Sequence, residues 1–185
     1  MTKQIGPLLT VADLTLMPDD GNRYELIEGE ILVSRAPSLK HQQIAGNLVA
    51  DLTIYLRQNP IGAVWATPGV IFTQFSGVIP DIVFVRKERL AEIVVSERLA
   101  GAPDLVIEIV SPGADNARRD RVAKRQLYGR HGVQEYWIVD PENGTVEVYR
   151  LQQQLLDLVV ILMAQDEITS PLLPGFSCLV SAIFS

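Results

Sequence analysis

The stretch Asp104-Leu-Val-Ile-Glu-Ile-Val110 decides the fold class of this chain of 185 residues. Five of its seven residues are aliphatic, and Ser111-Pro112-Gly113 ends the run. A short, almost wholly apolar run is typical of a central strand that is covered on both faces. A second run of this kind, residues 78–85, precedes it in the chain. Such strands need helices packed on the sheet, so the pattern indicates an α/β protein.

Two amphipathic helices are expected to cover this sheet. In residues 41–59, apolar side chains recur every three or four positions until a proline ends the pattern. A second helix is expected over residues 116–131, because Gly132 supplies a stop signal directly after it. Residues 1–20 are interpreted as an N-terminal flap or short helix, since Thr10 resembles a helix cap. Helical segments therefore separate the groups of strands, as an α/β sheet requires.

Further strands are expected on both sides of the apolar runs. They are predicted in a hairpin at residues 23–33, a strand at 64–75, a strand at 135–139 and a hairpin at 145–149. The apolar run 151–163 is compatible with strand or helix, because such a run carries no diagnostic period. The predicted architecture is a central mixed sheet flanked by helices, with β-hairpin additions near the N-terminal and C-terminal ends.

Composition excludes several classes of protein. Hydrophobic residues make up 48% and charged residues 21% of the chain, and the mean hydropathy is +0.18, as in ordinary folded proteins. We expect one domain over residues 1–185, large enough to fold without a metal or a disulfide. The lone Cys178 has no disulfide partner, and neither a signal peptide nor a membrane-spanning run is recognisable. We therefore expect a cytoplasmic protein with no membrane partner.

The charge distribution bears on the choice of partner. The formal net charge is −6, which by itself disfavours a nucleic-acid partner, because phosphate contacts need clustered Lys and Arg. Residues 115–131, however, hold six basic and two acidic residues, a net charge of +4, which leaves −10 for the rest of the chain. The second helix is thus a basic segment that could hold a phosphate backbone.

Two carboxylates, Asp81 and Glu108, interrupt the apolar runs. An ionised carboxylate in an apolar interior must be paired, protonated or bound to a cation. If the two strands are neighbours, both side chains converge at one position of the sheet, where acidic oxygens, water and a phosphate would suit Mg²⁺. The alternatives are an exposed or turn-capping role for Asp81 and a buried ion pair with an arginine for Glu108.

Lys124 differs from the other cations of the basic segment. It lies on the helical stripe of Ala117, Leu127 and Tyr128, from which its ammonium could reach the sheet. There it could stabilise the negative charge of a phosphoryl transition state or orient an attacking water. A solvated lysine on a basic helix is the alternative.

Spaced motifs in one order extend over nearly the whole chain, from about Leu9 to Phe184. They are Tyr24-Glu-Leu-Ile-Glu-Gly-Glu30, His41, Pro80-Asp81, Ala102 to Pro112, Asp120 to Lys124, and Tyr128 to Pro141. Together they resemble the Uma-type family of restriction endonuclease-like proteins, within the PD-(D/E)XK nuclease superfamily. The resemblance implies a restriction-endonuclease-like core that binds a divalent metal, Mg²⁺ or Mn²⁺, and acts on DNA.

The resemblance also implies residue roles. Asp81 and Glu108 take the places of the metal-holding acids, while Val110 stands where the superfamily has a lysine. Lys124 on the following helix is the natural replacement. His41 takes the place of an auxiliary residue at the rim of the site, although an ordinary side chain in the first helical turn is the alternative. A homodimer, formed through a hairpin or the C-terminal segment, also fits the superfamily.

The sequence therefore predicts a metal-dependent DNA endonuclease with Asp81, Glu108 and Lys124 as catalytic residues. The metal would polarise the scissile phosphate and activate a bound water. Val110 motivates an alternative from another class, a catalytically inactive nuclease-like module that binds nucleic acid or protein. A metal-free hydrolase that uses the two carboxylates on another substrate is a third reading.

Overall fold

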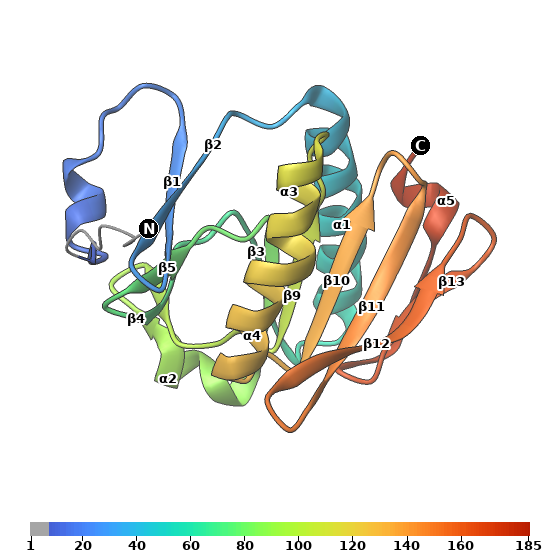
Figure 1. Ribbon diagram of the computed structural model, residues 1–185. Helices are drawn as coiled ribbons and strands as arrows, with labels where there is room; N and C mark the ends of the chain where they lie inside the picture. Colours follow the sequence, from blue (N-terminus) through green and yellow to red (C-terminus); the bar gives the residue numbers. More distant parts are fainter. Residues whose placement is uncertain (1–7) are drawn as a thin grey trace.

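The computed structural model describes residues 8–185, apart from the side chains of Ala114 and Asp115. Its central sheet has six strands in the order β12-β11-β10-β9-β6-β3 (Figure 1). The strands are β3 (Gly62–Ala66), β6 (Ile82–Arg86), β9 (Leu105–Ile109), β10 (Glu135–Asp140), β11 (Thr145–Gln152) and β12 (Leu155–Leu162). Strands β9 and β10 are parallel and the other neighbours are antiparallel. The predicted mixed sheet is thus present.

The two apolar runs lie at the centre of this sheet. Every residue of β9 and β10 is buried, because helices cover both faces. Leu105 and Ile107 point to the face covered by α1 (Leu39–Gln58). Val106 points to the opposite face, where it and its neighbours pack against the second helical segment. The alternation of β9 thereby assigns each of its residues to one helix.

The second helical segment is not one regular helix. It consists of α3 (Ala114–Arg118), a π-helical stretch, η3 (Arg119–Lys124), and α4 (Arg125–His131). Gly132, with φ 89°, ends it as expected. The continuous helix predicted over residues 116–131 is therefore corrected to a helix with a π segment, a feature frequent at functional sites.

A second sheet has the order β2-β1-β5-β4-β8-β7. Its strands are β1 (Arg23–Ile27), β2 (Glu30–Ser34), β4 (Val70–Thr73), β5 (Ser76–Val78), β7 (Val94–Val95) and β8 (Arg98–Ala100). The predicted N-terminal hairpin is its β1–β2 pair. Two short helices, η2 (Lys87–Arg89) and α2 (Leu90–Ile93), precede β7 in a region where the sequence predicts no element.

Two expected single strands are each divided between the sheets. The strand predicted at 64–75 is wrong, because β3 belongs to the central sheet and β4 to the second sheet. Thr67, with φ 51°, breaks it. The run 78–85 is divided in the same way between β5 and β6, and Pro80 lies at the break, where it removes a backbone donor. The chain therefore crosses from one sheet to the other immediately before Asp81.

The C-terminal region is β-structure followed by a short helix. The ambiguous run 151–163 forms the end of β11 and all of β12, joined by Gln153 and Gln154, both with positive φ. Then come β13 (Glu167–Ser170), β14 (Leu173–Leu179) and α5 (Val180–Ile183). At the other end, η1 (Asp13–Leu16) is the expected short helix, while residues 1–7 lie outside the described part. Within residues 8–185, no helix has the length and apolarity to cross a membrane.

Candidate active site

Strands β6 and β9 bring Asp81 and Glu108 together. Their antiparallel register pairs Ile82 with Ile107, so the next pair outward is Asp81 with Glu108, at a typical Cβ separation of about 5 Å. The backbone N–H of Ile109 donates to Asp81 Oδ2 at 2.8 Å, which fixes the aspartate against β9. Only 5% of Asp81 and 3% of Glu108 is exposed. The exposed role considered for Asp81 is therefore excluded.

Lys124 reaches this position from the π segment. Its Nζ lies 2.9 Å from Glu108 Oε1 and 3.0 Å from Glu25 Oε1. The hydroxyl of Tyr128, one helical turn later, donates to the same Glu108 oxygen at 2.6 Å. Lys124 is 2% exposed, so it is a buried cation and not a solvated surface lysine. The buried ion pair considered for Glu108 exists, but its partner is Lys124 instead of an arginine.

His41 joins the site from the first turn of α1. Ser38 caps this helix by accepting a hydrogen bond from the His41 backbone N–H. The ring Nε2 lies 3.0 Å from Asp81 Oδ2, and Nδ1 is buried without a hydrogen-bond partner among the described residues. Arg23 approaches the other oxygen of Asp81, with Nη1 at 3.6 Å from Oδ1. The four residues predicted from sequence thus surround one point of the sheet.

The structure adds side chains that the sequence reasoning did not assign. Glu25 of β1 accepts a hydrogen bond from the backbone N–H of Ile79 at 2.8 Å and pairs with Lys124. Asp120 is 2% exposed and receives Arg119 Nε at 3.4 Å. Asp120 and Lys124 are four residues apart, a spacing that places them on one face of a helix. The sequence could therefore have indicated Asp120 as a neighbour of Lys124. Glu25 lies in the motif Tyr24 to Glu30, which marks it as a supporting residue at most. Its role could not be assigned, because its position depends on pairing between distant strands.

These groups line a small cavity of about 30 Å³, and their charges are unbalanced. Burial raises the pKa of Glu108 to about 8; the negative charges of Asp81, Asp120 and Glu25 add to this rise, and Lys124 opposes it. Burial acts in the same direction on Asp81, but the hydrogen bond and charge interaction with His41, the backbone N–H of Ile109 and the charge of Lys124 together outweigh it and lower the pKa of that carboxyl. The site is thus a concentration of carboxylates that an added cation would stabilise.

Attraction by carboxylates also controls the charge of Lys124. Burial acts to lower its pKa, but Glu108, Glu25 and Asp120 together raise it above the usual value of lysine. The ammonium therefore stays protonated and positive beside the two central carboxylates. A group in this state can attract a negative charge, but it cannot act as a general base.

The donor set fits a metal that needs few protein ligands. Asp81 Oδ1 and Glu108 Oε2 accept no hydrogen bond from any described residue, while the other oxygen of each carboxylate is held by donors. Among the side chains that the structure describes, no group of three His, Cys, Asp or Glu has metal-binding geometry. Mg²⁺ commonly uses one or two carboxylates together with waters and substrate phosphate. A two-carboxylate site of this kind is what the geometry offers.

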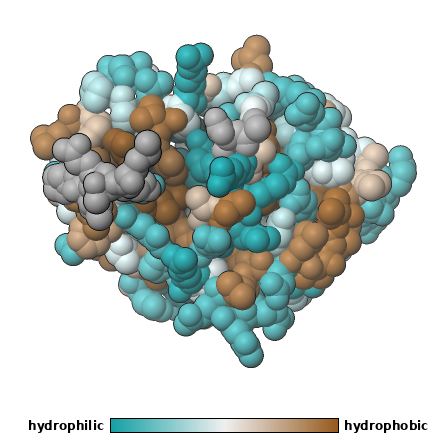
Figure 2. Space-filling model, viewed as in Figure 1, coloured by the Kyte–Doolittle hydropathy of each residue, from teal (hydrophilic) through white to brown (hydrophobic). Residues whose placement is uncertain are grey.

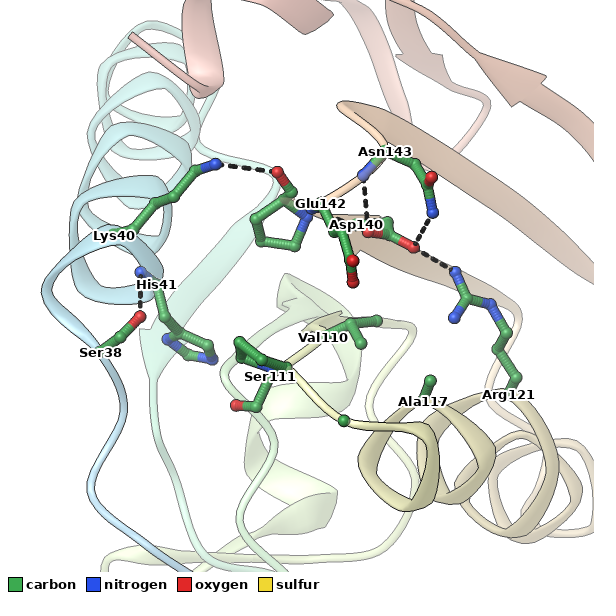
Figure 3. Close-up of a pocket in the computed structure, with 13 residues that line it drawn as sticks. Ser38, Lys40, His41, Val110, Ser111, Ala117, Arg121, Asp140, Glu142 and Asn143 are labelled. Atoms are coloured by element: carbon green, nitrogen blue, oxygen red, sulfur yellow. Dashed lines mark hydrogen bonds and ion pairs between the residues drawn. The ribbon is translucent and has the colours of Figure 1, made fainter.

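A larger cleft of about 590 Å³ opens beside this cavity (Figure 3). His41 and Ser111 line both spaces. At the far end of the cleft, Arg121 donates to Asp140, the last residue of β10. The buried carboxylates therefore have an adjoining space for part of a substrate.

The basic segment is less available to a phosphate backbone than its charge suggests. Four of its cations are paired within the protein: Arg119 with Asp120, Arg121 with Asp140 and Glu147, Lys124 with Glu25 and Glu108, and Arg130 with Glu28. Most of the net charge of +4 is thus neutralised by acids from other elements. The expectation of a free basic helical face is corrected accordingly.

Comparisons with known proteins agree with this architecture. A family model described as "Uma2: Putative restriction endonuclease" matches residues 11–181. A search among curated proteins found no match. Among solved structures, the chain is similar to a "putative nuclease belonging to DUF820" from Anabaena variabilis, with a TM-score of 0.75 and 22% identity over 95% of this chain and 97% of that chain. The predicted nuclease-like fold is confirmed.

Proposed function

Because this chain belongs to the Uma2 restriction endonuclease family, we propose that it hydrolyses phosphodiester bonds of DNA with the help of Mg²⁺ or Mn²⁺. The observation that carries the proposal is the convergence of Asp81, Glu108 and Lys124 in one buried site. Two neighbouring carboxylates, each with one oxygen that accepts no hydrogen bond from the described residues, suit a hard divalent cation. Such a cation would polarise the scissile phosphate and lower the pKa of a bound water.

The protein's own groups hold and orient this arrangement. Asp81 and Glu108 would bind the cation, while the hydrogen bonds of His41 and Tyr128 fix the carboxylate oxygens that face away from it. Lys124 takes the role of the lysine whose place Val110 occupies directly after β9. Its positive charge beside Glu108 would stabilise the negative charge that develops on the phosphate during attack.

Plasmid nicking tests the proposal. Wild-type protein with Mg²⁺ or Mn²⁺ is expected to convert supercoiled plasmid to the nicked form, and EDTA is expected to stop the reaction. Asp81→Asn, Glu108→Gln and Lys124→Ala should each lower the rate by about 100-fold or more, because each removes a group that acts on the transition state. Circular dichroism must show that the variants fold, since Lys124→Ala leaves buried carboxylates without their cation.

A triple variant that combines Asp81→Asn, Glu108→Gln and Lys124→Ala separates this proposal from its alternatives. Nicking at the same rate by the triple variant and the wild type would point to a contaminant and overturn the proposal. DNA binding without cleavage and without metal binding would favour the non-catalytic module. Cleavage that survives EDTA would favour a metal-free carboxylate mechanism.

A homodimer is the assembly we propose, with β12 as the contact. Within the described part of the chain, this edge strand pairs only with β11. It exposes Leu158, Val159, Val160 and Ile161, and Figure 2 shows an apolar surface on this side of the molecule. An exposed apolar edge is a template for pairing with a second strand. Val159→Lys is expected to convert a dimer to a monomer in light scattering, whereas Leu16→Lys is not; a monomeric wild type would contradict the assembly.

The free thiol of Cys178 is consistent with a reducing, cytoplasmic setting.

A further inference from the structure

The chemistry proposed above does not use the 590 Å³ cleft beside the carboxylates. Sites for small ligands generally have about 300–1,000 Å³, so the space has the size of a ligand site. A DNA duplex is far larger, since its major groove alone is about 12 Å wide. The shared walls at His41 and Ser111 connect the cleft to the cavity of Asp81 and Glu108. The occupant must therefore be a small piece of whatever binds at those carboxylates.

The cleft has no excess of positive charge that would favour a second phosphate. Its basic side chains, Lys40 and Arg121, are balanced in number by Asp140 and Glu142. Arg121 pairs with Asp140 at 2.7 Å, and Lys40 Nζ donates to the neutral carbonyl of Pro141 at 2.9 Å. The exposed carboxylate of Glu142, by contrast, makes no hydrogen bond or ion pair with any described residue. Figure 3 shows this carboxylate extending into the cleft. An unpaired negative group would repel phosphate and attract a hydrogen-bond donor.

The walls of the cleft suit the flat faces of a nucleobase. Val110, Pro112 and Ala117 contribute apolar surface, and the hydroxyl of Ser111 lies at the end nearest His41. Carboxylate side chains recognise bases by accepting a hydrogen bond from an exocyclic amino group, as with N4 of cytosine. A cleft with apolar surface and one unpaired carboxylate is therefore complementary to an amino-bearing base.

We propose that this cleft binds one unpaired nucleobase next to the scissile phosphate and that Glu142 accepts a hydrogen bond from the amino group of that base. The inference rests on the proposed nuclease function and specifies its substrate. Because a duplex does not fit into a cleft of about 590 Å³, the substrate strand is single-stranded at this point or has the base rotated out of the duplex. Thymine has no exocyclic amino group, so it is the disfavoured base.

Binding to short oligonucleotides in EDTA tests the pocket separately from cleavage. Fluorescence anisotropy is expected to show oligodeoxycytidine bound about fivefold more tightly than oligodeoxythymidine of equal length, the value of roughly one hydrogen bond. Glu142→Gln should remove the preference, because an amide can donate to thymine O4 as well as accept from cytosine. Equal binding of the two oligonucleotides by the wild type, or a preference that survives Glu142→Gln, would overturn the proposal.

A steric pair of variants tests the location. Ala117→Leu fills the cleft and should weaken binding of both oligonucleotides about tenfold or more. Ala123→Leu is the matched control, because Ala123 lies in the same helical segment but lines a different cavity. Unchanged binding by folded Ala117→Leu would overturn the proposed location. Cleavage with Mn²⁺ by a protein that binds the two oligonucleotides equally would refute the pocket alone. Preferential binding of oligodeoxycytidine by a protein that cleaves no DNA with Mn²⁺ would refute the nuclease function alone.

Discussion

The two carboxylate oxygens of Glu108 have different hydrogen-bonding surroundings. Lys124 and Tyr128 both donate to Oε1, so no described donor competes for Oε2. The pKa of Tyr128 is raised by burial and by the charge of Glu108, and the phenol therefore remains a proton donor at neutral pH. The hydrogen bonds from Lys124 and Tyr128 stabilise the buried carboxylate of Glu108 and also leave its Oε2 available to a cation.

Removing the hydroxyl of Tyr128 tests this orientation. Tyr128→Phe keeps the buried ring, which packs against Tyr136, but deletes the 2.6 Å hydrogen bond. The lost bond is worth about 1 kcal/mol, so the rate of DNA cleavage is expected to fall by about fivefold to tenfold. Single-turnover kinetics measure this effect. Tyr55→Phe, which removes a hydrogen bond to the distant Pro174 carbonyl, should leave the rate unchanged; equal losses in both variants would contradict the orienting role.

The central residues were predictable from sequence because each contradicts its local pattern. Asp81 and Glu108 interrupt apolar strands, and Lys124 lies on an inward helical stripe. Glu25 could not be found in the same way, because its role depends on the pairing of Leu26 with Gly77 between distant strands. Local patterns carry no information about such long-range pairing.

At the scale of elements, the packing of α4 depends on a small residue. A Cβ at Gly129 would lie 2.9 Å from the carbonyl oxygen of Gln154 and 3.2 Å from the backbone nitrogen of Leu156. Both atoms belong to the backbone of the β11–β12 hairpin, which cannot move aside as a side chain can. The glycine therefore allows the helix that carries Tyr128 to lie directly on this hairpin.

Gly129→Ala is expected to destabilise the protein by about 1–3 kcal/mol, because the clash outweighs the better helix propensity of alanine. Urea denaturation measures the free energy of unfolding. Gly46→Ala in α1 is the control, since no atom lies within 4 Å of its added Cβ and the change should be neutral or stabilising by up to about 1 kcal/mol. A Gly129→Ala variant as stable as the wild type would contradict the close packing.

The elements themselves show where sequence patterns suffice. Strand β9 and helix α1 were predictable because long, uniform patterns determine them. The divisions at Thr67 and Pro80 were not, because each half of those runs looks like part of one strand and only the sheet order separates them. The π segment likewise leaves no periodic signal over six residues.

For the whole molecule, the net charge of −6 and the internal pairing of most cations of the basic segment leave little free positive charge. DNA affinity then has to come partly from a divalent cation between the carboxylates and the phosphate. The proposed activity depends on that cation site, which the rest of the architecture surrounds.

Calorimetric titration of Mn²⁺ into the protein tests the site most directly. The wild type is expected to bind Mn²⁺ with measurable heat in the absence of DNA, and Glu142→Gln, outside the carboxylate pair, should behave as the wild type does. The double variant Asp81→Asn, Glu108→Gln, shown to be folded by circular dichroism, should give only heats of dilution, because both ligands have lost their charge. Identical binding curves for the wild type and this double variant would contradict the account.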